Sequence, residues 1–379
     1  MNRRLPVTLV GGFLGAGKTS LLHHFISEHQ GGHLAVLVEN PGALNLDAKA
    51  LRGLCGAMRR ANDTVLEIPN GEEAAQVEWI AARLREFSEA GRFERVLIEV
   101  GGTTNPAMLA RHFGLLPGQP ETFSTWAELH QSVCVVDALD FFRASQGNVL
   151  WDFQNEQIAG ASLVVLNKCD LIEEKERQAC TELLRSNNRD ARIIEAVYGE
   201  VPPELLSGRA MPEELGLAVQ RRSRRKAVGA TGPELASALY RVHRPFHPGR
   251  FWDWFNAEYP GLLRVKGLVW LATRNLLVGG VSRTRWQNAC GTAGIWWAAL
   301  PREEWPEESE ALMRMQETWR EPYGDRRQEL ILIGDAEQLS TTMRRQLDAC
   351  LLTEEEFARP LQEWAALPDP FPAWDVEEG

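Results

Sequence analysis

A glycine-rich segment near the start of the chain has residue types that bind phosphate. Residues 12–19 read Gly-Phe-Leu-Gly-Ala-Gly-Lys-Thr, the complete pattern G-x-x-x-x-G-K-[ST]. Its glycines would let backbone N–H groups converge on phosphates, Lys18 would bridge the β- and γ-phosphates, and the Thr19 hydroxyl would bind Mg²⁺. An apolar strand before it and a helix after it favour this interpretation over a chance glycine-rich turn. The predicted nucleotide-binding residues here are Gly12, Gly15, Ala16, Gly17, Lys18, Thr19 and Ser20.

A second motif, Asn167-Lys168-Cys169-Asp170, indicates which nucleotide binds. An aspartate carboxylate can accept two hydrogen bonds from guanine, one from N1–H and one from the exocyclic amine. Adenine presents the opposite donor pattern at that edge and would leave the carboxylate unpaired, which costs orders of magnitude in affinity. Asn167, Lys168 and Asp170 therefore predict GTP rather than ATP.

Between these motifs lies a strand that ends in an acid, Glu99, with Gly102 three residues later. We expect Glu99 to reach Mg²⁺, through water, and to join Lys18 in catalysis. The Gly102 N–H would sense the γ-phosphate, and loss of this contact on hydrolysis would act as a switch. The alternative for Glu99 is a solvated acid at a strand end. Asp47 is a candidate for the first switch, and a helix N-cap is the alternative for it.

The elements that position these motifs alternate between strand and helix from Leu5 to about Glu195. Several predicted strands are continuous apolar runs, as expected for parallel strands covered on both faces. We predict a doubly wound, mostly parallel α/β sheet. The predicted strands are Leu5–Val10, Leu34–Val38, Thr64–Ile68, Arg95–Glu99, Ser132–Val136, Ser162–Leu166 and Arg192–Glu195, and the clearest helices are Lys18–Glu28, Glu72–Ala90 and Glu173–Arg185.

Composition narrows the class of protein. The chain has 379 residues, 52 acidic and 41 basic side chains, and a net charge of −11. The acidic balance argues against nucleic acid as the main partner, and no apolar run approaches the roughly 20 residues that span a bilayer. The six scattered cysteines form no C-x-x-C pair, as expected for reduced thiols in a cytoplasm. Arg3-Arg4 and the following residues only superficially imitate a signal peptide, because the stretch runs into Lys18.

The composition changes after residue 205. We predict a phosphate-binding domain at 1–205, a linker with a basic run at 206–233, a smaller α+β domain at 234–358 and a loosely held acidic, proline-rich tail at 359–379. Ten of the 13 tryptophans lie beyond residue 230. In the second domain the predicted strands are Leu263–Leu271, Asn275–Val281, Gly294–Leu300 and Gln328–Ile333, and the predicted helices are Arg250–Phe255, Arg302–Trp319 and Glu337–Ala349.

These motifs together resemble the CobW family of metal-handling P-loop GTPases, relatives of the nickel-insertion GTPases for urease and hydrogenase. The resemblance spans about residues 5–358, so it also implies that family's second domain. It implies a GTPase that loads or delivers a divalent transition metal, often Zn²⁺ or Co²⁺. The residues that carry it are 11–19, 99–106, 167–170, 244–248, 264–271 and 324–330.

The family's metal motif is missing. Where the family has Asn-Gly-Cys-x-Cys-Cys, this chain has Asn70-Gly71 followed by Glu-Glu-Ala-Ala at 72–75. Soft thiolates are the ligands that favour Zn²⁺. Glu39, Glu72 and Glu73 could form a second metal site, but carboxylates prefer hard ions, and first-turn helix acids are the alternative for the last two. The first switch is also altered: the family's Asn-Glu-Phe-Gly is replaced by Glu-Asn-Pro-Gly at 39–42.

Other polar groups favour structural interpretations. His243 and His247 are four residues apart, but the prolines around them disfavour one helical turn that chelates a metal. His23 and His24 are adjacent and would point in different directions. The basic run at 221–226 favours a solvated linker over a nucleic-acid contact. Most tryptophans and the scattered thiols are expected in cores.

The sequence thus predicts a Mg²⁺-dependent GTPase that acts on a metalloprotein client. With no arginine finger or glutamine to assign, we expect slow intrinsic turnover, raised by a partner or by homodimer formation. The alternative is a GTP-binding regulatory module that has lost metal transfer. A small-molecule kinase is disfavoured by Asn167–Asp170.

Overall fold

The chain forms two compact units, Met1–Pro233 and Glu234–Gly379. The computed structural model describes residues 4–29, 31–39, 63–69, 71–102, 104–114, 122–146, 151–206, 235–259, 261–284, 287–305, 312, 315–316 and 318–374. Within these residues, none of the helices combines the length and the apolar character that a membrane crossing requires.

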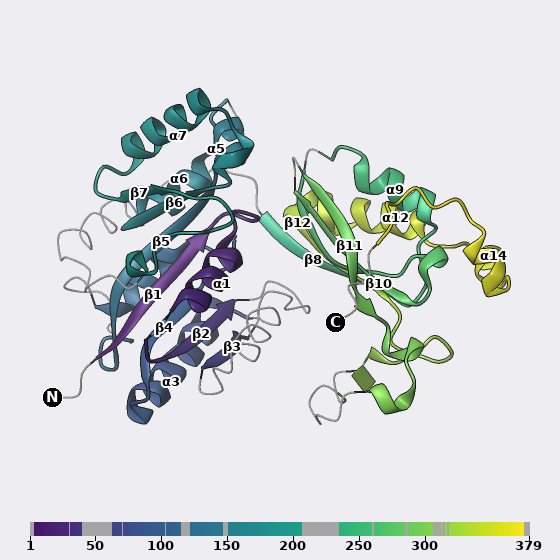
Figure 1. Ribbon diagram of the computed structural model, residues 1–379, viewed down its shortest axis with the longest axis horizontal. Coiled ribbons are helices and arrows are strands. Elements are labelled where there is room, and N and C mark those ends of the chain that lie inside the picture. The colour runs from purple at the N-terminus through teal and green to yellow at the C-terminus, as the bar shows by residue number, and fades with distance from the viewer. Residues whose placement is uncertain are drawn as a thin grey trace. The chain divides into compact units, whose positions relative to one another are not determined.

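A seven-stranded sheet forms the centre of the first unit (Figure 1). The strand order is β3-β2-β4-β1-β5-β6-β7, and every neighbouring pair is parallel. The predicted doubly wound α/β fold is confirmed. Since β1 lies between β4 and β5, the carboxyl ends of these three strands are adjacent, the usual place for a ligand in such a sheet. The strands are β1 (Leu5–Gly12), β2 (His33–Glu39), β3 (Thr64–Ile68), β4 (Phe93–Glu99), β5 (Ala127–Asp137), β6 (Leu163–Asn167) and β7 (Arg192–Glu195).

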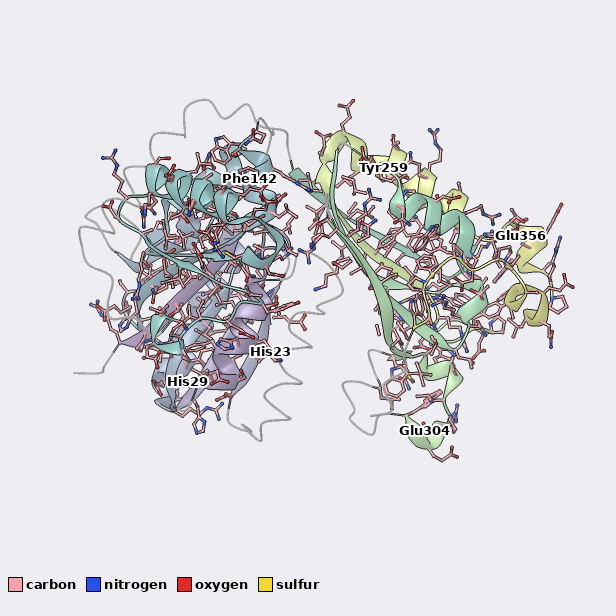
Figure 2. The ribbon with its side chains drawn as sticks, turned by 45° about the horizontal axis from the view of Figure 1, so that its top comes forward. His23, His29, Phe142, Tyr259, Glu304 and Glu356 are labelled. Atoms are coloured by element: carbon pink, nitrogen blue, oxygen red, sulfur yellow. The ribbon has the colours of Figure 1, made fainter. Side chains whose placement is uncertain are left out.

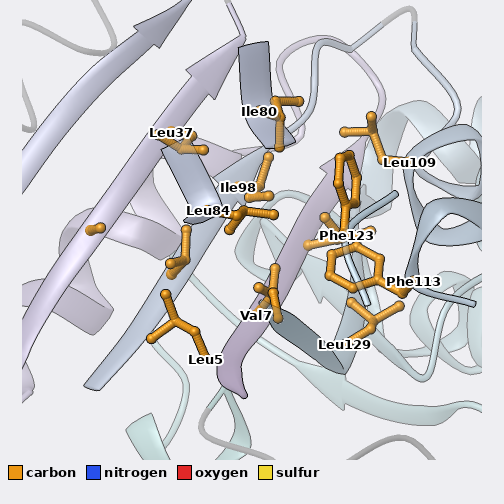
Figure 3. Packing of buried hydrophobic residues seen from close by; sticks show 14 of the residues in the cluster. Leu5, Val7, Leu37, Ile80, Leu84, Ile98, Leu109, Phe113, Phe123 and Leu129 are labelled. Atoms are coloured by element: carbon orange, nitrogen blue, oxygen red, sulfur yellow. The ribbon is translucent and has the colours of Figure 1, made fainter. Parts of the chain in front are cut away.

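Helices cover both faces of this sheet because successive strand residues point to opposite sides. Helix α1 packs with Val36 and Val135, whereas α3 packs with the neighbouring Leu37 and α5–α7 with Val136. Figure 3 shows the α3 side of this core. The helices are α1 (Lys18–Glu28), α3 (Glu73–Ala90), α4 (Pro106–Ala110), α5 (Ala138–Ala144), α6 (Trp151–Ala159) and α7 (Glu174–Asn187), with short 3₁₀ turns η1 (Arg111–Phe113), η2 (Cys169–Leu171) and η3 (Pro203–Leu205).

The second unit is an antiparallel five-stranded sheet, in the order β11-β10-β9-β12-β8, with helices packed on it. Aromatic side chains from α9 and aliphatic side chains from α12 form its main core with the strands. The predicted α+β class is therefore confirmed. The elements are β8 (Leu235–Val242), α9 (Pro248–Asn256), β9 (Leu262–Val269), β10 (Leu277–Thr284), β11 (Asn288–Ile295), β12 (Gln328–Asp335), α11 (Ala336–Ser340), α12 (Thr342–Cys350), α13 (Glu354–Phe357) and α14 (Leu361–Ala365), with 3₁₀ turns η4 (Ala272–Arg274), η5 (Trp297–Ala299) and η6 (Arg302–Glu304).

Two predicted elements of the second unit have wrong boundaries. The predicted strand Gly294–Leu300 is placed too late, because β11 ends at Ile295 and a 3₁₀ turn follows. The predicted helix Arg302–Trp319 begins too early, because residues 302–304 form a 3₁₀ turn and Trp305 is extended, whereas the described residues 312, 315, 316 and 318 are helical. Pro306 explains the second error, since proline forces the preceding residue out of the helical region. Strand β8 was not predicted.

The C-terminal tail is not loosely held up to residue 374. Trp364, Phe371 and Trp374 are 2%, 5% and 8% exposed. The Arg274 guanidinium lies 4.2 Å from the ring centroid of Trp374 and donates from Nε to the Asp369 Oδ2 at 2.8 Å. Aromatic side chains and one partly buried ion pair thus hold a segment that its proline and acid content predicted to be loosely held.

An arginine–glutamate pair makes the second unit sensitive to acid. Arg250 donates through both terminal nitrogens to Glu356 (labelled in Figure 2), at 3.1 and 2.6 Å. This bidentate bond lowers the pKa of Glu356 from 4.5 to about 2. Since the folded-state pKa is depressed, the pair stabilises fully above pH 4.5, and this contribution is lost as the pH falls toward 2.

We therefore expect Glu356→Gln to reduce the acid sensitivity of the second unit. Tryptophan fluorescence reports mainly on this unit. The thermal unfolding midpoint measured by it should fall less between pH 5 and pH 3 in the variant than in the wild type. Glu354→Gln is the matched control, because the Glu354 side chain is 91% exposed. Equal loss of acid sensitivity in both variants would contradict the assignment.

Candidate nucleotide-binding site

The glycine-rich loop connects β1 to α1 at the carboxyl end of the sheet. Gly12 and Gly17 have φ angles of 131° and 101°. A Cβ at Gly12 would lie 2.1 Å from the Val135 carbonyl oxygen, and one at Gly17 would lie 2.2 Å from the Asn167 amide nitrogen. Only glycine permits these approaches. The loop therefore lies against β5 and the Asn167 motif, with the positive end of α1 directed at it.

Lys18, Thr19 and Glu99 meet at this loop. Lys18 is 8% exposed, and its ammonium donates to the carbonyl oxygens of Gly12 at 3.0 Å and Phe13 at 3.4 Å. The Thr19 hydroxyl donates to the two Glu99 carboxylate oxygens at 3.1 and 3.4 Å. Glu99 is itself 4% exposed. A hydroxyl and a carboxylate side by side are oxygen donors of the kind that Mg²⁺ prefers, so these residues fit that ion. Ser20 follows them and is exposed.

The Asn167 motif follows β6 and contacts the loop. Asn167 is 1% exposed; its amide donates to the Ala16 carbonyl at 2.8 Å, and its oxygen accepts from the Gly199 N–H at 2.9 Å. Lys168 has a φ of 61° and its ammonium pairs with Asp137 at 2.7 Å. Asp170 lies exposed in η2. Asn167 thus holds the loop, while the carboxylate of Asp170 faces solvent, where a base could reach it.

Gly102 belongs to the loop after β4 and packs against the glycine-rich loop. A Cβ at Gly102 would be 2.9 Å from the Leu14 N–H nitrogen. On the other side, Glu39 at the end of β2 accepts hydrogen bonds from the Gly101 N–H and the Thr104 hydroxyl, both at 2.8 Å. The other switch candidate, Asp47, lies outside the described residues.

The three acids of the suggested second metal site do not come together. Glu39 bonds to the loop after β4, Glu72 is the N-cap residue of α3, and Glu73 in its first turn pairs with Arg111. Across the described ranges, no three His, Cys, Asp or Glu side chains are grouped so that they could hold a metal. The tentative site is therefore wrong as a preformed cluster, and the interpretation of Glu72 and Glu73 as helix-start acids is confirmed.

The histidines have the structural roles that the sequence favoured. His247 caps α9, its Nδ1 accepting from the Arg250 N–H at 3.4 Å. His243 Nδ1 lies 3.2 Å from the Arg326 carbonyl oxygen. His24 contacts the Val201 carbonyl, while His23, labelled in Figure 2, is exposed.

The thiols are equally structural. Cys134 and Cys350 are buried, and burial raises the pKa of each to about 12. Neither is a ready thiolate ligand. Cys55 and the basic run at 221–226 lie outside the described residues.

Sequence reasoning missed several residues at this site. Gly199, which follows β7, donates its backbone N–H to the side-chain oxygen of Asn167. Asp137 ends β5 as Glu99 ends β4, so the strand-end rule that found Glu99 could also have found Asp137. Gln157 on α6 donates to the carbonyls of the loop after β4, and no short motif marks it.

A glycine-rich loop between β1 and α1, on a parallel doubly wound sheet, defines the P-loop class of nucleotide-binding proteins. The model of the CobW/HypB/UreG nucleotide-binding domain matches residues 6–195, and that of the cobalamin synthesis protein cobW C-terminal domain matches residues 235–351. The chain therefore belongs to the CobW family of P-loop GTPases, of which it is a divergent member without the Cys-x-Cys-Cys motif.

Named relatives agree with this placement. The zinc-regulated GTPase metalloprotein activator 1 of Dictyostelium discoideum is 26% identical over 399 residues, covering 97% of this chain and 84% of that protein. Its namesake in Schizosaccharomyces pombe is 31% identical over 202 residues, covering 52% and 47%. The zinc chaperone CobW of Pseudomonas aeruginosa is 29% identical over 243 residues, covering 56% and 62%. The last two matches thus span less than two thirds of those relatives. The Zn(II)-bound YjiA GTPase of Escherichia coli has a TM-score of 0.39 and 17% identity, over 92% of this chain and 100% of that structure.

Proposed function

We propose that this chain is a Mg²⁺-dependent, GTP-binding and GTP-hydrolysing accessory protein that serves a metalloprotein client as a metallochaperone or activator. The observation that carries the proposal is the grouping of Lys18, Thr19 and Glu99 at the glycine-rich loop. The names of the relatives, which include a metalloprotein activator and zinc chaperones, support the metal-related part. A cytoplasmic location would suit the reduced thiols.

Each residue has a defined task in this proposal. Lys18 releases the carbonyls of Gly12 and Phe13 and turns to the phosphates, where its charge stabilises the transition state. Thr19, and Glu99 through water, would hold Mg²⁺, which would supply positive charge to offset that of the phosphates. Asp170 accepts the guanine N–H groups, and the Gly102 N–H senses the γ-phosphate. With no arginine finger or catalytic glutamine to assign, intrinsic turnover is slow, and a partner or a homodimer raises it.

The alternative function is a GTP-dependent regulatory module that has lost metal transfer. The glutamates and alanines at 72–75, where the family has thiolates, favour it. The acids at Glu39 and Glu73 do not compensate, because each already has a protein partner. Under the first proposal, Zn²⁺ or Co²⁺ would be cargo, held with ligands that the client supplies.

The test is a GTPase assay on metal-stripped protein. With Mg²⁺ alone we expect slow GTP hydrolysis, and without Mg²⁺ a loss of at least about 100-fold, since phosphate charge would be left uncompensated. Protein that neither binds nor hydrolyses GTP with Mg²⁺ contradicts the proposal. Zn²⁺, Co²⁺, Mn²⁺ and Fe²⁺ are then titrated in. Stoichiometric binding that changes turnover supports metal delivery, and indifference to all of them supports the regulatory alternative.

A further inference from the structure

The loop after β4 is held from two sides by complementary hydrogen bonds. On one side the Glu39 carboxylate accepts from the Gly101 N–H and the Thr104 hydroxyl, each at 2.8 Å. On the other side the Gln157 amide of α6 donates to the carbonyls of Gly102 at 3.3 Å and Thr104 at 3.1 Å. The loop's donors thus bond to a strand end and its acceptors to a helix. Its position depends on both.

Because the Gln157 side chain is buried, breaking its hydrogen bonds would cost free energy. Gln157 is 2% exposed, so moving the loop would leave its amide without water or carbonyl partners, which costs more than an exposed bond. Gly102 has no room to shift toward the glycine-rich loop, since even a Cβ would lie 2.5 Å from the Leu14 side chain. The segment that would sense the γ-phosphate is therefore tied to α6.

One helical turn earlier, α6 is connected through α5 to the base-recognition end of the site. Gln154 is 5% exposed, and its amide donates to the Asp140 carboxylate at 2.7 Å. The Asp140 N–H donates to Asp137 Oδ1 at 3.1 Å, and Asp137 Oδ2 pairs with the Lys168 ammonium at 2.7 Å. Polar contacts therefore run from the loop after β4, through α6 and α5, to the Asn167 motif.

We propose that α6 couples the two ends of the nucleotide site. Gln157 positions the loop that senses the γ-phosphate, and Gln154 positions Lys168 through Asp140 and Asp137. Because residues three apart in a helix lie on one face, a displacement of α6 moves both contacts together. The inference rests on the proposed GTP-dependent function and adds to it two positioning residues, neither of which touches nucleotide.

The first test is Gln157→Met, which keeps the side-chain volume and removes the amide. We expect the Kd for GTP to rise about 10-fold and kcat to fall by a similar factor, because the substitution removes both hydrogen bonds of the buried amide. The Kd for GDP should stay within twofold, since GDP has no γ-phosphate. Gln178→Met, at an exposed position of α7, is the matched control and should change neither. Equal losses for GTP and GDP would overturn the positioning role.

Coupling is tested by a double-mutant cycle on GTP affinity. Gln154→Met should weaken GTP and GDP equally, by about fivefold, and should not change the ratio between them. The double variant should deviate from additivity by at least threefold, and strict additivity would overturn the coupling. If Gln157→Met does not fold, Glu39→Gln, which loosens the same loop from the other side, should give the same selective loss for GTP.

Failure of the inference is distinct from failure of the proposed function. Wild-type protein that binds no GTP overturns both. Wild-type protein that binds and hydrolyses GTP, with an unchanged GTP-to-GDP ratio in Gln157→Met and in Glu39→Gln, overturns the inference alone.

Discussion

Asp170→Asn should lower GTP affinity by about 100-fold or more and create affinity for xanthosine triphosphate. Under the proposed function, the carboxylate would accept two hydrogen bonds from guanine, and bonds to a charged group contribute about 1.5–3 kcal/mol each. An asparagine amide places a donor where the guanine amine is also a donor. Xanthine has a carbonyl oxygen at that position, so the mismatch is removed. Nucleotide Kd values for GTP, XTP and ATP measure this exchange of preference.

The structure supplies a control for this experiment. Asp170 is exposed in η2, so the substitution should leave the thermal midpoint of the nucleotide-free protein unchanged. Glu182→Gln removes one exposed carboxylate from α7 and should retain the GTP affinity of the wild type. A Kd for GTP within threefold of wild type in Asp170→Asn would show that guanine is not recognised there.

The sequence predicted the first unit well because its signals are local. Apolar runs indicated each strand. The loop motif also predicted where α1 begins, and the helix does begin at Lys18. The order of strands needs contacts that are distant in sequence, but the parallel class follows from alternation of strand and helix. The predicted nucleotide-binding residues lie in two short motifs, at 12–20 and 167–170, so they too could be proposed from local sequence.

Residues that act across the fold could not be found in this way. Gln157 reaches a loop 53 residues earlier in the chain, and Glu39 reaches Thr104 across 65 residues. Their types are ordinary, and only the folded sheet brings them together. The second unit shows the same limit. Strand β8 follows the predicted linker and contains small residues. The tail is held by Trp364 and Trp374, and the prolines and acids around them gave no sign that these side chains are buried.

Lys18→Ala should have the largest effect on function, with GTP affinity reduced at least 100-fold and hydrolysis about 1,000-fold. The ammonium is the cation of the glycine-rich loop, and a charge-assisted bond to phosphate in a partly dry site contributes more than a neutral bond. Lys18 is buried and bonded to backbone carbonyls. Its removal therefore also eliminates the cost of burying a charge, and the thermal midpoint without nucleotide should change little.

One further variant separates charge from geometry at this position, and a second serves as a control. Lys18→Arg keeps the charge but replaces a point ammonium with a planar fork, which cannot follow the same path between the carbonyls of Gly12 and Phe13. We expect it to restore less than a tenth of wild-type turnover. Lys175→Ala, at an exposed position of α7, should behave as wild type. If Lys18→Ala binds GTP within threefold of wild type, the loop does not hold phosphate, and the nucleotide site must be sought elsewhere.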